Sequence, residues 1–256
     1  MRKVIYTCLT GGYDVLKQPA VTDPSFDYVC FTDDASKGHD GIWELRPIPF
    51  ETDSVTRARY AKLHPHTLLP EYEVSVFMDA NLCISGEEFY AQVEYAISAG
   101  HLVAGLPHPQ RDCVWDELRY CYLKDKLTTA QAFRHHRFLG RISMPRHAGL
   151  YETNILLRFH NEPTVVALDT KWWELFSACC SRDQLTFTPA LLLQGFKMPP
   201  HLFSKARCAR NVPFVQYTLH PAAGSSAKNT PGRLTWGNIR YRLRLSWRQL
   251  CLLFLR

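Results

Sequence analysis

The chain has 256 residues, of which 46% are hydrophobic, and this is enough to bury the core of one large domain. The composition therefore excludes an intrinsically disordered chain. A formal net charge of +6 suits an anionic small substrate or an anionic membrane surface. No nucleic-acid-binding signature accompanies that charge, so we expect no nucleic-acid partner.

Apolar runs alternate with segments of helical periodicity along most of the chain. This order predicts an α/β fold with a Rossmann-like, mostly parallel sheet flanked by helices. The expected strands are 3–9, 26–32, 42–48, 74–78, 101–105 and 150–157.

Two helices carry start signals. Ser85 and Glu88 have the spacing of a capping box, with Gly100 closing the helix, and Thr128 and Gln131 have the same spacing. We expect one domain over 1–220, a loop or linker over 221–238 and a tail over 239–256.

The tail carries five arginines among leucines and tryptophan. It is too short and too charged to span a bilayer, which takes about 20 apolar residues. It is either a basic amphipathic helix that binds a membrane surface or a terminal helix docked on the core with its arginines in water.

The cysteines and the N-terminal residues indicate the cellular compartment. Nine cysteines lack the paired spacing of a zinc site or a disulfide framework, so we expect reduced thiols. Met1 leads directly into a strand pattern, without a signal peptide. We expect a cytoplasmic protein, with the inner face of the membrane as an alternative through the tail.

The strand at 74–78 ends in Asp79-Ala80-Asn81. Hard oxygen ligands at i and i+2 can share one divalent ion, and such an ion neutralises a departing diphosphate. An ordinary turn is the alternative, because Asp and Asn favour turns.

Polar groups also follow the first two strands. Thr10, Gly11 and Tyr13 form a turn where a ligand can approach the backbone and a base can stack on the ring, and Asp33 could contact a ribose or base. A tight turn with a packed tyrosine and a solvated loop are the alternatives.

Cations and further polar groups complete the candidate site. On a helix, Arg59 and Lys62 share a face that could reach a diphosphate, whereas Arg57 points elsewhere; a solvated basic helix is the alternative. His108 and Arg111 follow a strand end, which favours contact with the acceptor or diphosphate.

For Arg111, a buried pair with Glu117 is the structural alternative. Trp172 and Trp173 share a helical pattern, and at least one of them is expected in the core rather than beneath a sugar.

The segment from Ser181 to Gln184 has capping-box spacing, with Asp183 in the first helical turn. Thr188 and Pro189 could start a helix of their own, which would leave Asp183 freer to face a pocket. Helix capping alone also accounts for all of these residues.

Together, these segments resemble the GT-A type glycosyltransferase-like family described from plant turgor and mucilage proteins. The resemblance covers about 3–200 and excludes the tail. It is carried by residues 4–14 (VIYTCLTGGYD), 27–34 (DYVCFTDD), 57–62 (RARYAK), 75–81 (SVFMDAN), 108–113 (HPQRDC), 149–158 (GLYETNILLR) and 181–185 (SRDQL).

A wider similarity to the retaining family 8 glycosyltransferases implies roles for individual residues. By that similarity, a basic helix, the Asp-x-Asp strand end and an Asp-Gln pair correspond to Arg59, Lys62, Asp79, Asn81, Asp183 and Gln184. Glu152 and Asn154 lie on the strand that approaches the sugar. Asn81 departs from the pattern, which has a carboxylate there, and His220 is the candidate for an additional metal ligand.

The resemblance implies a glycosyltransferase that uses a UDP-sugar or another nucleotide-sugar donor, assisted by Mn²⁺ or Mg²⁺. The expected acceptor is a glycan or a lipid-linked saccharide of surface polysaccharide synthesis. Asp183, Gln184 and Glu152 would act at the anomeric centre. Asp183 or Glu152 would serve as base in an inverting reaction, and retention is favoured.

Replacing Asp79 by Ala or Asp183 by Asn is expected to remove most turnover and to leave stability nearly intact. Two other functions stay open. The chain could be a nucleotide-sugar binding protein without turnover, or a metal-dependent ester hydrolase.

Overall fold

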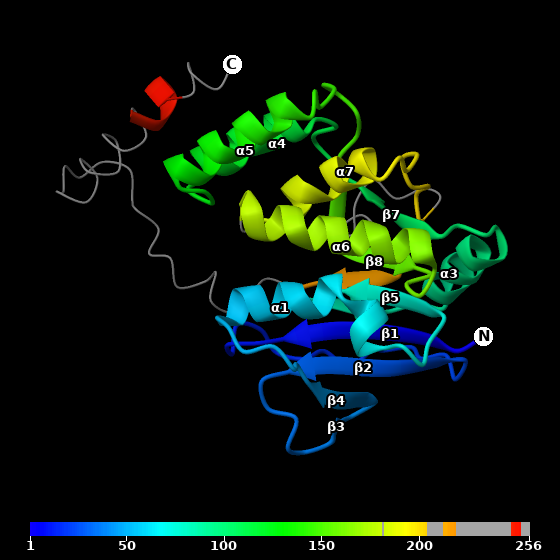
Figure 1. Cartoon of the computed structure of the whole chain (residues 1–256). Helices are drawn as coiled ribbons and strands as arrows, with labels where there is room; N and C mark the ends of the chain where they lie inside the picture. Colours follow the sequence, from blue (N-terminus) through cyan, green and yellow to red (C-terminus); the bar gives the residue numbers. More distant parts are fainter. Residues whose placement is uncertain (181, 204–211, 219–246, 252–256) are drawn as a thin grey trace.

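The computed structural model describes residues 1–180, 182–203, 212–218 and 247–251. A seven-stranded sheet with the order β3-β4-β2-β1-β5-β8-β7 forms its centre (Figure 1). Strands β4, β2, β1 and β5 are parallel, and β8 lies antiparallel between β5 and β7. The prediction of a mostly parallel sheet flanked by helices is confirmed. The strands are β1 Lys3–Leu9, β2 Phe26–Thr32, β3 His39–Asp40, β4 Trp43–Pro47, β5 Val74–Met78, β7 Val103–Pro107 and β8 Tyr151–Arg158. A second sheet pairs β6 Leu82–Ile84 with β9 Val215–Tyr217.

Helices cover both faces of the large sheet. Apolar side chains of α1, α6 and α7 pack on one face, and those of α3 pack with β6 and β9 on the other. Helices α4 and α5 form a third cluster with the start of α7, and Figure 1 shows them away from β1–β4. The helices are α1 Ser54–Leu63, α2 Pro65–Leu68, α3 Glu88–Ser98, α4 Val114–Leu123, α5 Thr129–Arg141, α6 Pro163–Ala178 and α7 Asp183–Leu193.

The two predicted capping boxes have different outcomes. Thr128 and Gln131 form the reciprocal box at the start of α5, as predicted. The box at Ser85 is wrong, because the Ser85 amide donates to the carbonyl of Phe214 and extends the β6–β9 pairing. Helix α3 begins three residues later without a side-chain cap.

Helix α7 runs from Asp183 through Pro189 without a break, so the predicted second start at Thr188 is wrong. Phe187 and Leu191 are buried in the same cluster as the apolar face of α6. Their burial offsets the hydrogen bond that a proline inside a helix removes. Ser181 lies outside the described residues, and the N-cap Arg182 makes no side-chain cap bond.

Within the tail, the structure describes residues 247–251 as a helical turn. Arg248 is buried and donates to the backbone carbonyls of Tyr122 and Leu127 and to the carboxylate of Asp125. The interpretation of a docked tail with its arginines in water is therefore wrong for this arginine. The predicted linker 221–238 lies outside the described residues.

Two further findings concern the described part of the chain. It contains eight of the nine cysteines, and all eight are free thiols. None of its helices has the length and apolar character needed to cross a bilayer.

Candidate functional site

Asp79 occupies a turn at the carboxyl end of β5. Its amide donates to the carbonyl of Asn154 at 2.9 Å, and its carbonyl accepts from Leu82 at 2.9 Å, closing the turn into β6. The Asp79 side chain is 40% exposed, so its carboxylate can reach a ligand. The strand thus presents an acidic group at the predicted position.

Asn81 follows in the same turn and is buried. Its Nδ2 donates to the carbonyl of Thr218 at 3.3 Å, and its backbone carbonyl accepts from the Thr218 amide at 2.9 Å. These bonds fix the position of the side-chain amide group. The other predicted metal ligand, His220, lies outside the described residues.

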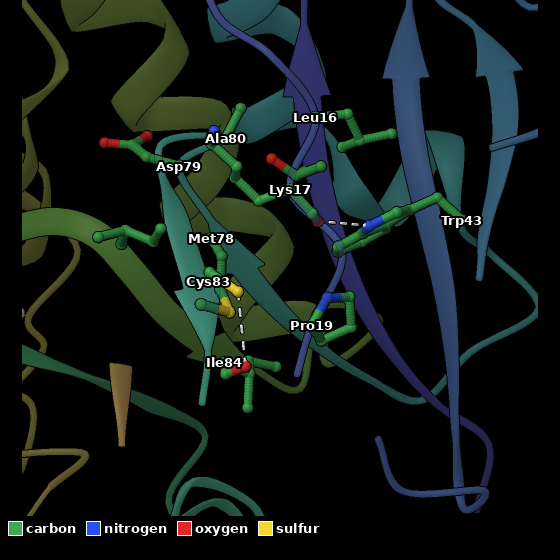
Figure 2. A pocket seen from close by; sticks show the side chains of 11 residues that line it. Leu16, Lys17, Pro19, Trp43, Met78, Asp79, Ala80, Cys83 and Ile84 are labelled. Atoms are coloured by element: carbon green, nitrogen blue, oxygen red, sulfur yellow. Dashed lines mark hydrogen bonds between the residues drawn. The ribbon is translucent and has the colours of Figure 1, made fainter. Parts of the chain in front are cut away.

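A narrow hollow adjoins this turn on the side of the second sheet (Figure 2). It encloses about 10 Å³, which is room for about one water molecule. Leu16, Lys17 and Trp43 line it, and Figure 2 shows the Asp79 carboxylate pointing away from all three. The carboxylate therefore points out of this hollow and lies on the side of Lys62.

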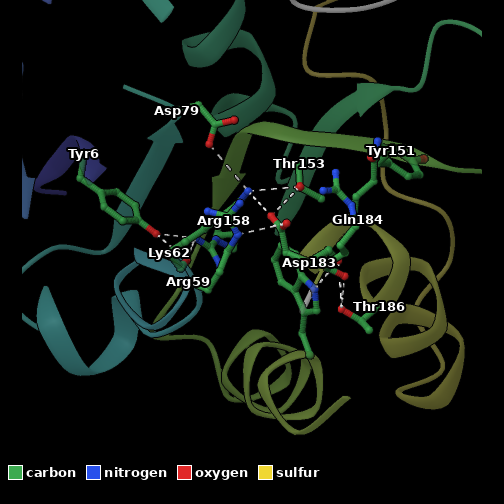
Figure 3. Close-up of polar contacts among 12 residues, drawn as sticks. Tyr6, Arg59, Lys62, Asp79, Tyr151, Thr153, Arg158, Asp183, Gln184 and Thr186 are labelled. Carbon is green, nitrogen blue, oxygen red and sulfur yellow. Dashed lines mark hydrogen bonds and ion pairs between the residues drawn. The ribbon is translucent and has the colours of Figure 1, made fainter. Parts of the chain in front are cut away.

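The centre of the candidate site is an ion pair between Lys62 and Asp183. Lys62 Nζ lies 2.5 Å from Asp183 Oδ2 and 3.1 Å from Thr153 Oγ1, and the Thr153 hydroxyl donates to the same carboxylate at 2.9 Å (Figure 3). All three residues are buried. This arrangement joins α1, β8 and α7 at one point.

Two further charged groups meet this pair. Arg59 Nε lies 3.1 Å from Asp183 Oδ1, and Lys62 Nζ lies 3.9 Å from Asp79 Oδ1. Arg59 and Lys62 thus share a helix face as predicted, whereas Arg57 pairs with Asp33 and Glu51. We call Arg59, Lys62, Asp79 and Asp183 the charge cluster. Its two positive and two negative groups sum to zero.

The charge cluster changes the acidity of Asp183. Burial by itself would raise its pKa, but the positive charges of Arg59 and Lys62 outweigh burial and hold that pKa well below its usual range. A carboxylate with so low a pKa is a poor proton acceptor at neutral pH. Asp183 is therefore better suited to hold cations in place than to act as a general base.

A second buried network holds the backbone of Lys62. Its carbonyl accepts from Tyr6 Oη at 2.9 Å and from Arg158 Nη2 at 2.7 Å. Arg158 pairs with Asp169 at 2.9 Å, and all of these side chains are inaccessible to solvent. This network was not predicted from the sequence, although the position of Arg158 at the end of an apolar strand was a signal for it.

The start of α7 is fixed in a similar way. Trp172 Nε1 donates to the carbonyl of Asp183 at 2.9 Å, so this tryptophan belongs to the core, as expected for at least one of the pair. Gln184 Nε2 donates to the carbonyl of Tyr151 at 3.1 Å. Gln184 therefore ties α7 to β8 beside the charge cluster.

The turn after β1 lies next to the end of β2. The Gly11 amide donates to Asp33 at 2.6 Å, and the Thr10 hydroxyl donates to the carbonyl of Ser54 at 2.8 Å. Gly11 has φ +65°, and a Cβ there would lie 2.8 Å from Ser54 Oγ, so only glycine fits. Tyr13 is 54% exposed, which leaves its ring accessible to a ligand.

His108 and Arg111 make local contacts. Arg111 pairs with the buried carboxylate of Glu117, the structural alternative raised by the sequence. His108 Nδ1 accepts from the amides of Gln110 and Arg111, and burial lowers the pKa of this imidazole. Within the described residues, no hydrogen bond or ion pair joins them to the charge cluster.

Glu152 and Asn154 also lie on β8. Glu152 lies between Tyr151 and Thr153 and pairs with Leu106 of β7, next to a shift in the register of the two strands. Asn154 contacts Asp79 through its backbone, and its side-chain oxygen is buried without a hydrogen-bond partner in the described chain. The grouping of Glu152 with Asp183 at the anomeric centre stays a prediction.

No protein-family model matches the chain, and no curated protein sequence matches it. Among solved structures, it is similar to the galactosyltransferase LgtC in complex with donor and acceptor sugar analogues, with 11% identity, a TM-score of 0.43 and coverage of 96% of this chain and 95% of that one. Mouse xyloside xylosyltransferase 1 gives 10% identity and a TM-score of 0.42, covering 74% and 81%. The bifunctional glycosyltransferase WbbM gives 8% identity and a TM-score of 0.43, with 77% of this chain matching 38% of that one. The chain thus spans well under half the length of that bifunctional enzyme.

Proposed function

We propose that this protein is a nucleotide-sugar-dependent glycosyltransferase with a GT-A type fold. The observation that carries the proposal is the position of Lys62, within ion-pair distance of both Asp79 and Asp183. Three of the motifs that resemble the glycosyltransferase-like family, at 57–62, 75–81 and 181–185, supply the charge cluster. Their convergence supports the family assignment.

The donor nucleoside is proposed to bind beside the turn after β1. Strands β1, β2 and β5 are parallel neighbours, so their carboxyl ends meet at one edge of the sheet, where α/β folds bind ligands. Tyr13 offers an accessible ring for the base, and Asp33 lies beside the Gly11 amide. The diphosphate would then extend toward Asp79.

The charges of the site support a divalent cofactor, Mn²⁺ or Mg²⁺. Because the charge cluster sums to zero, it offers no excess positive charge to a diphosphate, and a bound ion would supply it. The accessible carboxylate of Asp79 and the amide oxygen of Asn81 are suitable ligands. His220 follows Thr218 by two positions, a span of at most about 7 Å, and Thr218 pairs with Asn81. We propose His220 as the third ligand.

Retention is the stereochemical course we propose. The similarity to the retaining family 8 enzymes favours this course, and the low pKa of Asp183 makes that carboxylate unsuitable as the base of an inverting reaction. An inverting reaction would have to use Glu152 as its base, so Glu152→Gln with unchanged transfer would support retention. Asp183 instead fixes Arg59 and Lys62, and its negative charge can stabilise an oxocarbenium-like centre. Gln184 orients the start of α7, and Glu152 on β8 is proposed to contact the acceptor.

We propose a glycan or a lipid-linked saccharide of surface polysaccharide synthesis as the acceptor and a cytoplasmic site of action. The basic tail would hold the enzyme at an anionic membrane surface. Trp247 and Leu250, which are 60% and 51% exposed, offer apolar contacts there. Charge reversal at Arg240, Arg242 and Arg244 should abolish sedimentation with anionic vesicles, and unchanged sedimentation would refute the membrane role.

Calorimetry with a panel of nucleotide sugars, with and without Mn²⁺, tests the function, together with an assay of slow donor hydrolysis. We expect one donor to bind in the presence of Mn²⁺ and to be hydrolysed. Asp79→Ala should lose both properties, and Asp40→Ala, an exposed acidic position on β3, should keep both. Binding without hydrolysis or transfer would favour the binding protein, and ester cleavage without a nucleotide would favour the hydrolase.

A further inference from the structure

A second group of metal-ligating side chains lies outside the charge cluster, at the start of α4. Cys113, Asp116 and His147 each offer one ligand atom, and these atoms all lie within 4.8 Å of one another. Cys113 precedes α4, Asp116 is in its first turn, and His147 belongs to the connection between α5 and β8. The fold brings the histidine to the other two from 31 residues beyond Asp116.

We propose that these three side chains bind one Zn²⁺ ion, with a water molecule in the fourth position. A thiolate, an imidazole and a carboxylate form a donor set that Zn²⁺ accepts and that Mg²⁺ and Ca²⁺ do not favour. Ligand atoms around one tetrahedral zinc lie about 3–4 Å apart. The half-buried Asp116 side chain can close the difference from 4.8 Å by rotation while His147 keeps its bond to Asp112.

The orientation of His147 supports this site. Its Nδ1 lies 2.7 Å from Asp112 Oδ1, so Nδ1 carries the proton and Nε2 is left to bind a metal. A carboxylate that accepts from the second ring nitrogen is the usual outer partner of a zinc-bound histidine. Asp112 would thus orient the ligand without contacting the ion.

The proposed ion would connect the loop before α4 to the connection between α5 and β8. The Gly149 amide donates to the carbonyl of Asp112 at 2.8 Å, and Trp115 Nε1 donates to the carbonyl of Met144 at 3.0 Å. The connection after α5 leads directly into β8, which carries Thr153 of the charge-cluster network. Zinc would fix this entry to β8, and Cys113 would release its thiol proton on binding.

The site is independent of the proposed sugar transfer, and its test needs no donor. Calorimetric titration with Zn²⁺ is carried out on the full chain carrying Asp79→Ala, which lacks the proposed diphosphate-site ligand, and should show one equivalent bound. His147→Gln should lose this equivalent, and His39→Gln, at an exposed histidine on β3, should keep it. Asp112→Asn in the same background should weaken binding about 10- to 100-fold.

Co²⁺ provides a second measurement that does not depend on stability. The Co²⁺-loaded protein should show a thiolate-to-cobalt charge-transfer band, and Cys113→Ser should lose it while Cys83→Ser retains it.

Zn²⁺ at 100 times its Kd should raise the thermal midpoint by about 5 °C. Absence of saturable binding, an unchanged stoichiometry in His147→Gln, or a Co²⁺ spectrum without the thiolate band would each overturn the proposal.

Discussion

Asp183→Asn tests how the charge cluster is held together. The substitution removes one negative charge from between Arg59 and Lys62. Lys62, whose side chain is 2% exposed, would keep the Thr153 hydroxyl at 3.1 Å and, as its remaining acidic partner among the described residues, the carboxylate of Asp79 at 3.9 Å. Removing one partner of a buried ion pair costs about 3–5 kcal/mol. We expect about 3 kcal/mol here, the lower end of that range, because Asp79 remains and Arg59 is 31% exposed.

A chain of this size loses about 2–4 °C of thermal midpoint per kcal/mol, so the variant should melt roughly 6–12 °C below the parent. This replaces the expectation from sequence that stability stays nearly intact. Thermal unfolding at neutral pH measures the change, with Glu174→Gln as the control. Glu174 forms an exposed pair with Lys171, and its loss should cost less than about 0.5 kcal/mol.

The dependence on pH follows from the low pKa of Asp183 in the folded state. A depressed carboxyl pKa contributes stability that is present above the unfolded-state pKa and is lost only as the pH falls through the folded value. The difference between parent and variant should therefore stay constant between about pH 6 and 8. A cost below about 1 kcal/mol, or a difference that changes across this range, would refute the described pairing.

Further substitutions separate stability from binding. Asp79→Ala should cost less than about 1 kcal/mol, because the side chain is 40% exposed, and should abolish donor hydrolysis; retained hydrolysis would contradict the metal-diphosphate role. Thr153→Val should cost about 1–2 kcal/mol in urea denaturation, and an unchanged midpoint would argue against its bonds to the ion pair. Burial lowers the pKa of His160 from 6.5 to about 4, so up to about 3 kcal/mol of stability should be lost as the pH falls from 6.5 to 4. Urea titrations should show a smaller loss in His160→Gln. An equal loss in the variant would mean that this histidine does not cause the pH dependence. Arg248→Ala should cost about 2 kcal/mol through its lost carbonyl contacts, and a neutral effect would mean that the tail is not docked.

Much of the sheet could be predicted from sequence, because its central strands are uninterrupted apolar runs that end at turn residues. Strands β1, β2 and β5 have the predicted bounds, and the other predicted strands, β4, β7 and β8, differ by one or two residues at each end. The short strands β3, β6 and β9 were not predicted. The helix starts were harder. Ser85 has the same local spacing as Thr128, yet its amide belongs to a sheet pairing with Phe214, which is distant in sequence.

The sequence predicted which residues belong to the candidate site better than it predicted the contacts between them. Helical periodicity correctly placed Arg59 and Lys62 on one face. It could not show that Asp183 would form ion pairs with both side chains, because Lys62 and Asp183 are 121 residues apart in the sequence. The network of Tyr6, Arg158 and Asp169 was missed for the same reason.

The central claim is that Asp79 binds a metal-diphosphate as a sugar is transferred, and a crystal grown with UDP and Mn²⁺ tests it most directly. The account predicts a manganese anomalous peak bound by the Asp79 carboxylate, with the diphosphate beside Lys62 and Arg59. A fully occupied UDP whose diphosphate lies elsewhere, with no manganese at Asp79, would contradict it.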